Sequence, residues 1–363
     1  MATVLHVAEA FSTGIVHSIS KICWGLDRDV QFHVLHGNRV ETPKDYRTYF
    51  PPSVQFTPWN VSRKLDLRAD FAALRELQQA IHRIQPDLIH AHSSKAGGLA
   101  RLLPPSNGTK IIYSPRGYSF LQKDVSVLKR LIYRTIERAL GARSHITVAC
   151  GIGEYRVALE VTKHAHMIPN MIDLHEYDVV KRDSVEPEIM VAMVGRICAQ
   201  KNFPLFCRIA AAVQDLGMKF LWIGDGPVPP DVKIPDNVSI TGWLSKQDVS
   251  KTLSRCKIFL QTSLWEGLPI AVLEGMAVGL AILAKPAVGN TELVIEGVNG
   301  HLCNAEEEFV DRLRELSSEP ERLHQLGEAS RQLVEDHYSK DKILARWRSL
   351  YLNYDRYLSS GFI

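Results

Sequence analysis

Short apolar runs alternate with amphipathic segments along the whole chain. Between the runs lie helical patterns such as residues 66–85, where Leu67, Phe71, Leu74, Leu77 and Ile81 recur at spacings of three and four. Strand candidates fall at residues 3–10, 30–36, 88–93, 110–115, 145–150, 189–195, 219–224, 238–243, 257–263, 280–286 and 300–304. Alternating strands and helices indicate parallel sheets, so the pattern predicts two doubly wound α/β domains.

Length and local composition predict the boundaries of these domains. A chain of 363 residues exceeds what one hydrophobic core usually serves. We expect an N-terminal domain at 1–178, a polar linker at 179–188 and a second domain at 189–339. A C-terminal helical segment, 340–363, follows the last strand and is expected to cross back to the first domain. Ligands of open α/β sheets gather at the carboxyl ends of the strands, so we expect a cleft there between the domains.

Composition narrows the class of protein. The chain is 45% hydrophobic and 23% charged, without an apolar run long enough to span a membrane or an N-terminal leader pattern, which predicts a cytoplasmic protein. Six scattered cysteines without a CxxC pair argue against zinc and disulfides. Residues 1–170 hold 22 Lys+Arg against 13 Asp+Glu, while residues 171–363 are acidic. The basic half suits phosphates or an anionic membrane, although a merely solvated surface is an equal alternative.

Glycine turns follow two strands of the second half, and the first of them carries two cations. Gly195 ends the run IMVAMV, and Arg196 and Lys201 then stand at the predicted cleft edge. Arginine offers a planar fork of donors and lysine a point charge, a combination that suits a diphosphate. Gly224 begins a similar compact loop, GDGP. Two solvated basic residues are the alternative.

Two glutamates occupy the apolar stretch SLWEGLPIAVLEGMA. Glu266 lies in a predicted strand-to-helix turn, and Pro269 suits the first helical position. The backbone from Gly267 through Leu268 to Ala271 would then offer free N–H groups to a phosphate. Glu274 follows within the helix, where it could accept hydrogen bonds from ribose hydroxyls. A glycosidase-like acid pair and ordinary surface acids are the alternatives.

Together these motifs resemble the retaining glycosyltransferases of family four, which have the GT-B fold. The resemblance rests on E-x7-E, the G-R-x4-K-N turn, GDGP, VGNTELVIEGVNGHL, HAHSSKAG, YSPRGYSF and MIPNMID, in the right order over nearly the whole chain. It removes the glycosidase alternative. It implies that Arg196 and Lys201 bind the donor diphosphate, Glu266 the donor sugar and Glu274 the ribose. The Gly267–Leu268–Pro269 backbone would lie beside sugar and phosphates.

The sequence departs from the family at three positions. The usual glycine pair, which the resemblance places near the acceptor or the diphosphate, is reduced to Thr13–Gly14. Arg116 stands where the family often has histidine near the reacting sugar, and arginine cannot act as a base. Met171 replaces a common glycine. His92 shares a strand face with His90, and both a ligand contact and a buried hydrogen-bonded role stay open for it.

One helical segment raises the question of a membrane. In residues 123–142 apolar side chains recur at three to four and arginines at four, which places a basic stripe beside an apolar face. The resembling enzymes often act on lipid-linked acceptors, so this helix either lies on an anionic membrane or is an ordinary domain helix. No pattern typical of nucleic-acid binding is present.

The sequence therefore predicts a glycosyltransferase that moves a sugar from a nucleotide diphosphate, expected to be uridine diphosphate, to a glycan or lipid-linked acceptor of surface polysaccharide synthesis. No cofactor or metal is expected, because no Asp-x-Asp ends a strand. A nucleotide-sugar 2-epimerase and a non-catalytic nucleotide-sugar-binding subunit are the alternatives.

Overall fold

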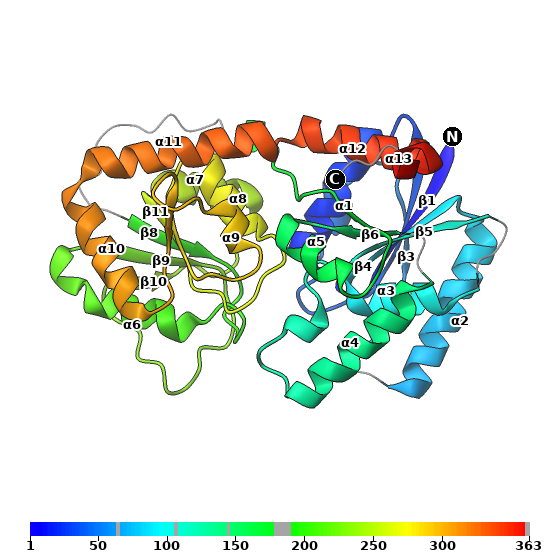
Figure 1. Cartoon of the computed structure of the whole chain (residues 1–363), viewed down its shortest axis with the longest axis horizontal. Coiled ribbons are helices and arrows are strands. Elements are labelled where there is room, and N and C mark those ends of the chain that lie inside the picture. Colours follow the sequence, from blue (N-terminus) through cyan, green and yellow to red (C-terminus); the bar gives the residue numbers. More distant parts are fainter. Residues whose placement is uncertain (63–65, 105–107, 144–145, 178–189, 360–363) are drawn as a thin grey trace. The chain divides into compact units, whose positions relative to one another are not determined.

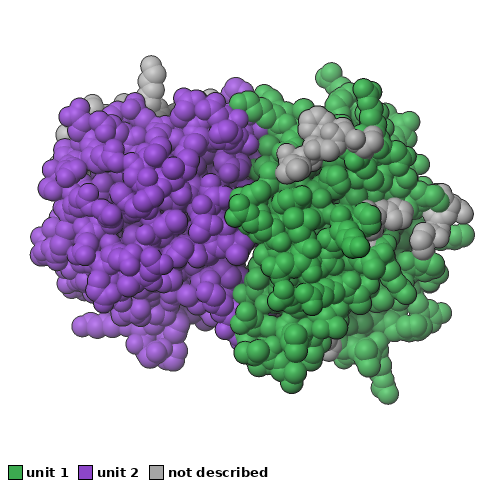
Figure 2. Space-filling model, in the orientation of Figure 1, with its two compact units in different colours: residues 1–121, 125–170, 341–363 green, residues 122–124, 171–340 purple. Residues whose placement is uncertain are grey.

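The chain forms two parallel α/β sheets, each in its own compact unit. A computed structural model describes residues 1–62, 66–104, 108–143, 146–177 and 190–359. Unit 1 comprises 1–121, 125–170 and 341–363, and unit 2 comprises 122–124 and 171–340 (Figure 2). The predicted linker 179–188 lies outside the described residues. The prediction of a GT-B fold with two doubly wound sheets is confirmed.

Unit 1 contains a seven-stranded parallel sheet in the order β3-β2-β1-β4-β5-β6-β7. Its strands are β1 (Ala2–Ala8), β2 (Val30–His36), β3 (Gln55–Pro58), β4 (Leu88–His92), β5 (Lys110–Ser114), β6 (Ile146–Ala149) and β7 (Ala165–Met167). Its helices are α1 (Thr13–Leu26), α2 (Leu67–Ile84), α3 (Ser93–Leu102), α4 (Val127–Gly141), α5 (Ile152–Leu159), α12 (Lys340–Leu352, from residue 341) and α13 (Tyr354–Ser359). The strand order reverses between β1 and β4, and right-handed crossovers therefore place α1 and the sequential helices α2 to α4 on opposite faces.

Unit 2 contains a six-stranded parallel sheet in the order β10-β9-β8-β11-β12-β13. Its strands are β8 (Met190–Val194), β9 (Lys219–Ile223), β10 (Val238–Ile240), β11 (Ile258–Gln261), β12 (Ala281–Ala284) and β13 (Gly300–Leu302). Its helices are α6 (Phe203–Ala212), α7 (Lys246–Ser254), α8 (Ile270–Ala277), α9 (Asn290–Leu293), α10 (Glu306–Ser318) and α11 (Pro320–His337). Figure 1 labels the elements of both units.

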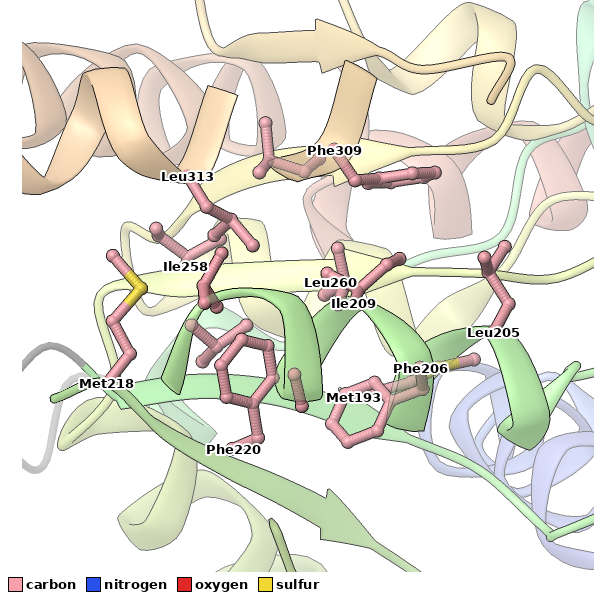
Figure 3. Packing of buried hydrophobic residues seen from close by; sticks show 14 of the residues in the cluster. Met193, Leu205, Phe206, Ile209, Met218, Phe220, Ile258, Leu260, Phe309 and Leu313 are labelled. Atoms are coloured by element: carbon pink, nitrogen blue, oxygen red, sulfur yellow. The ribbon is translucent and has the colours of Figure 1, made fainter. Parts of the chain in front are cut away.

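The core of unit 2 shows why its strands read as continuous apolar runs. Phe220 of β9 and Leu260 of β11 are buried beneath α6, which contributes Phe206, while Phe309 comes from α10 (Figure 3). A parallel sheet is covered on both faces, so its strands lose the polar alternation of half-exposed strands. Among the described residues, no helix combines the length and apolar character needed to cross a membrane.

The first turns of α2 differ from the helix predicted for 66–85. Leu77 and Ile81 are buried as their spacing predicts, whereas Leu67 is 91% and Phe71 62% exposed. Asp66 caps the helix by accepting hydrogen bonds from two backbone N–H groups. The apolar periodicity thus continues beyond the part of the helix that contacts the core.

Candidate active site

In unit 2 the strand order reverses between the neighbouring parallel strands β8 and β11. Strands β9 and β10 extend from one side of β8, while β12 and β13 extend beyond β11. Crevices outside such reversal points are the usual ligand sites of open α/β sheets. The loop after β8 carries Gly195 to Lys201, and the loop after β11 carries Glu266. The fold therefore brings two separately predicted motifs to one edge.

Lys201 and Glu266 form an ion pair at this edge. The Nζ of Lys201 lies 2.7 Å from Oε1 of Glu266, and their side chains are only 16% and 9% exposed. Gln261 donates through Nε2 to the same oxygen at 3.4 Å. Burying a lone charge is costly, and pairing these two opposite charges reduces that cost. A cation and a carboxylate are thereby held together without being fully withdrawn from solvent.

Glycines allow the loops after β8 and β9 to approach each other. Gly195 N donates to Ile223 O at 2.9 Å, and Ile197 N donates to Asp225 O at 2.8 Å. Gly224 has φ +141°, and a Cβ there would lie 2.2 Å from the carbonyl oxygen of Gly195. Only glycine fits this approach. The Gly195 loop that carries half-buried Arg196 is therefore fixed from the side of β9.

Glu274 lies on α8, which starts one residue later than predicted. Pro269 is the N-cap of α8 and Ile270 its first residue, whereas the sequence placed proline first in the helix. Oε1 of Glu274 accepts a hydrogen bond from the hydroxyl of Tyr177 at 3.0 Å. Burial, then the Glu274 carboxylate, raises the pKa of Tyr177, so this hydroxyl stays protonated and can donate.

No sequence motif pointed to Tyr177. Tyr177 lies close in sequence to the polar stretch that was expected to be a linker. Its aromatic ring just before that stretch is the one feature of the sequence that could have indicated a packed position. Leu268, next to Gly267, is buried, and a Cβ on Gly289 would meet the Gly267 carbonyl oxygen at 1.9 Å. The predicted Gly267–Pro269 segment is therefore packed closely against the loop after β12.

In unit 1 the candidate residues lie around the reversal point between β1 and β4. Gly14 is exposed in the first turn of α1, directly after the loop that follows β1. His92 is the last residue of β4 and fully buried. Its Nε2 lies 2.9 Å from Nδ1 of His6. The structure thus gives His92 a buried hydrogen-bonded partner, and a ligand contact of His92 stays a prediction.

His92 belongs to a buried histidine cluster, which we define as His6, His90 and His92. His90 lies 2.6 Å from the hydroxyl of Tyr351 through Nδ1 and 2.9 Å from Oγ of Ser114 through Nε2. Tyr351 lies on α12, so the cluster joins the C-terminal helix to the sheet of unit 1. His6 and Tyr351 were not predicted, although His6 faces the same side of the sheet as His90 by strand register.

The histidine cluster is also the one place in the described chain where three potential metal ligands converge. One ligand atom from each ring lies within 4.8 Å of the others. Both nitrogens of His90 are already in hydrogen bonds, and a metal would have to replace some of them. Burial lowers the pKa of all three rings, and the nearby cationic Arg116 lowers it further. These residues fit a hydrogen-bonded cluster better than a cation site.

Arg116 occupies a strained position beside this cluster. Its φ is +57°, a conformation that non-glycine residues rarely adopt, and its Nη1 donates to Oδ1 of Asn170. Glu154 supports the loop by accepting hydrogen bonds from the backbone N–H groups of Gly117 and Cys150. Arg116 is thus positioned by its surroundings, and its predicted proximity to the sugar stays a prediction.

We expect acidification to destabilise unit 1 through the histidine cluster. Burial, and to a lesser extent Arg116, lowers the pKa of His6 to about 3, and burial also lowers those of His90 and His92. Below about pH 6.5 the unfolded chain binds protons that the folded chain excludes, so each group costs up to about 1.4 kcal/mol per pH unit. Urea unfolding at pH 7 and pH 5 measures this loss.

His6→Gln is expected to reduce that pH dependence, because it removes one of the three excluded protons. The control is His324→Gln, since the imidazole of His324 is largely exposed on α11. A free energy of unfolding that falls between pH 7 and pH 5 as steeply in His6→Gln as in His324→Gln would show that His6 is not an origin of the acid sensitivity.

Comparison with known proteins identifies the class to which this fold and site belong. Residues 13–170 match the glycosyl transferase 4-like domain model, and residues 188–319 match the model of glycosyl transferases group 1. The chain belongs to the group 1 glycosyltransferases of family four, which are retaining enzymes of the GT-B fold that use nucleotide-sugar donors. The family resemblance predicted from the motifs is confirmed.

The individual relatives share little sequence identity with this chain. The chain is 24% identical over 299 residues to UDP-Gal:α-D-GlcNAc-diphosphoundecaprenol α-1,3-galactosyltransferase of Escherichia coli, covering 75% of this chain and 71% of that protein. Sucrose-phosphate synthase from Thermosynechococcus elongatus superposes with a TM-score of 0.81 at 14% identity, covering 98% of this chain and 100% of that one. HepE of Anabaena, solved with UDP-glucose, gives 0.76 at 15% identity and covers 96% and 100%. At these identities the structures establish the fold alone.

Proposed function

We propose that this enzyme transfers a sugar, with retention, from a uridine diphosphate sugar to a hydroxyl of a glycan or lipid-linked acceptor in surface polysaccharide synthesis, at the cytoplasmic side of the cell membrane. The observation that carries the proposal is the Lys201–Glu266 pair at the reversal point of the second sheet. The Escherichia coli relative, named for a UDP-galactose donor and a diphosphoundecaprenol acceptor, supports the choice of nucleotide and acceptor class.

In this proposal the polar residues of unit 2 divide the donor between them. Lys201 and Arg196 hold the diphosphate. The ammonium of Lys201 has three N–H donors, so it can keep its bond to Glu266 while donating to phosphate. Glu266 also accepts from a hydroxyl of the donor sugar. The glycine turns at Gly195 and Gly224 let the donor approach the backbone.

Glu274 is proposed to bind the ribose, while Tyr177 orients it. One carboxylate oxygen accepts from Tyr177, and a carboxylate retains further acceptor sites for vicinal hydroxyls. The backbone of Gly267, Leu268 and Pro269 lies at the start of α8, where the positive end of a helix favours the negative phosphates.

The proposed chemistry depends on electrostatics rather than on a side-chain base. As the bond from the anomeric carbon to the diphosphate breaks, charge grows on the leaving oxygen and is stabilised by Arg196 and Lys201. That oxygen takes the proton from the incoming hydroxyl, which attacks the same face. These cations supply the charge that a metal would otherwise provide, so we propose that no metal is required.

Residues of unit 1 are proposed to serve the acceptor and the reacting sugar. Gly14 would lie near the acceptor, and His92 and Arg116 near the sugar. Arg116 would act through its charge and position, since its guanidinium cannot serve as a base. The strained φ of Arg116 is of the kind that clusters at functional sites.

Donor binding is tested by the thermal stability of the full chain with UDP and UDP-sugars. A donor present at 100 times its dissociation constant is expected to add about 2.7 kcal/mol. Glu274→Ala should lose much of this stabilisation, because the ribose hydroxyls lose their acceptor. Glu328→Ala is the matched control, since Glu328 is an exposed acid on α11. Equal stabilisation of both variants would contradict the proposed role of Glu274.

Product analysis separates transfer from the alternatives. With the stabilising donor and a diphosphoundecaprenol-linked sugar, we expect a new α-linked glycan, detected by mass spectrometry and nuclear magnetic resonance. Epimerised donor formed without any acceptor would identify a 2-epimerase. Donor binding with no turnover across a broad acceptor panel would identify a non-catalytic subunit.

A further inference from the structure

Helix α4 turns its apolar side away from the core of unit 1. Leu140 near the end of the helix is buried, whereas five other large aliphatic residues are between 43% and 77% exposed: Val127, Leu128, Leu131, Ile132 and Ile136. An amphipathic helix of a globular domain normally buries its apolar stripe and exposes its polar side. The arrangement of α4 is the reverse. The sequence left open whether this was an ordinary domain helix, and the exposed residues argue against that alternative.

Polar contacts on the inner side hold α4 in this orientation. Glu137 is buried and pairs with Arg101 of α3 at 2.8 Å. Nε of Arg130 donates to the carbonyl oxygen of Phe120 at 3.1 Å. Rotating the helix to bury its aliphatic residues would break these bonds and leave Arg101 unpaired. The outward apolar side is therefore a built feature of the fold.

Helix α2 extends the same surface. Leu67 and Phe71, in its first two turns, are both exposed. Helix α3 contacts both α2 and α4, and all three connect strands in one direction along the sheet, so they form one layer. Figure 1 shows the starts of α2 and α4 at the same edge of this layer. We call the combined surface the apolar helix face: Leu67, Phe71, Val127, Leu128, Leu131, Ile132 and Ile136.

Basic residues border the apolar helix face. Residues 123–143 contain six Lys+Arg and two Asp+Glu. One of the two acids is Glu137, whose charge is buried and paired with Arg101. Lys129 and Arg138 are exposed on α4. Aliphatic side chains flanked by Lys and Arg on an exposed helix are the pattern of interfacial membrane binding.

We propose that the apolar helix face docks unit 1 onto an anionic lipid bilayer. The aliphatic residues enter the boundary between headgroups and acyl chains, and the flanking cations contact the headgroups. A second copy of the chain fits less well, because a two-fold contact through this face would oppose like charges. The face lies at the helix starts, hence at the carboxyl edge of the strands, where ligands of unit 1 would bind. Docking does not depend on the transfer reaction.

Vesicle flotation of the full-length chain tests this proposal. Phosphatidylcholine vesicles with and without phosphatidylglycerol serve as probes at low and high salt. We expect binding to the anionic vesicles that weakens with salt, because headgroup attraction is screened. The triple variant Leu128→Ser, Leu131→Ser, Ile132→Ser should bind at least about tenfold more weakly, because inserted apolar area supplies much of the affinity.

A matched variant and a second measurement separate docking from folding and self-association. Ile295→Ser with Val298→Ser removes exposed aliphatic residues of unit 2 and should bind like the wild type. The thermal midpoint of the triple variant should stay within a few degrees of the wild type, since the altered side chains are exposed. The proposal would be overturned if the wild-type protein did not bind anionic vesicles, or if the triple variant bound them as tightly as the wild type. A dimer by light scattering that the triple variant converts to monomer would assign the face to a second copy instead.

Discussion

Lys201→Ala is expected to lower kcat about 100- to 1000-fold, the usual cost of removing one well-placed donor to developing charge. Lys201 is the residue that the structure places against Glu266 at the reversal point of the second sheet. Its ammonium would face the diphosphate as the bond to the sugar breaks, when negative charge grows most. The effect should therefore appear in kcat more than in KM.

Two further variants show whether the loss reflects charge at the reacting centre. Lys201→Arg keeps the cation but changes its shape, so we expect partial activity. Lys219→Ala, at the exposed first residue of β9 in the same sheet, should retain wild-type kcat. Thermal midpoints should be recorded for all variants, because alanine also leaves Glu266 buried without its partner. Near-normal turnover by folded Lys201→Ala, with the donor that stabilises the chain, would refute the proposed role.

Glu137→Ala is expected to lower the free energy of unfolding of unit 1 by about 3–5 kcal/mol, because it strands a buried charge. Arg101 is 2% exposed, and its guanidinium lies 3.9 Å from the ring centroid of Tyr113. Glu137 satisfies both partners: it pairs with Arg101 at 2.8 Å and accepts from the Tyr113 hydroxyl at 2.9 Å. Alanine would leave the Arg101 guanidinium and the Tyr113 hydroxyl without this acceptor.

An exposed ion pair between α4 and the residue that follows α5 provides the comparison. Arg134 pairs with Glu160, and both side chains are at least 40% exposed. Glu160→Ala should therefore cost at most about 1 kcal/mol. Denaturant unfolding followed by circular dichroism measures both variants. A Glu137→Ala cost as small as that of Glu160→Ala would mean that the internal pair does not hold α4 in place.

The alternation of strands and helices could be predicted from the sequence because both sheets are parallel and buried on both faces. Continuous apolar runs such as those of β8 and β11 are typical of buried parallel strands when helical patterns separate them. The family motifs could be recognised in the sequence for a related reason, since their glycines and charged residues are confined to a few positions at strand ends. The roles assigned to those residues remain predictions.

Long-range partners could not be read in this way. Tyr177 reaches Glu274 across 97 residues, and His90 meets Tyr351 across 261. No local periodicity encodes such pairs, because the strand order and the return of the C-terminal helix decide which side chains meet. His92 shows the consequence, since a strand pattern alone left both its roles open.

Helix α4 separates what the sequence determined from what only the tertiary structure decided. The sequence by itself determined two doubly wound domains, the family, and an amphipathic segment predicted for 123–142, of which Val127–Gly141 forms helix α4. Periodicity fixes which residues share a side of a helix, but not which side meets the core. The buried Glu137–Arg101 pair, formed only when α3 and α4 pack together, turns the aliphatic side outward. The same pairing through space joins Lys201 to Glu266, because neighbouring strands β8 and β11 bring their loops together.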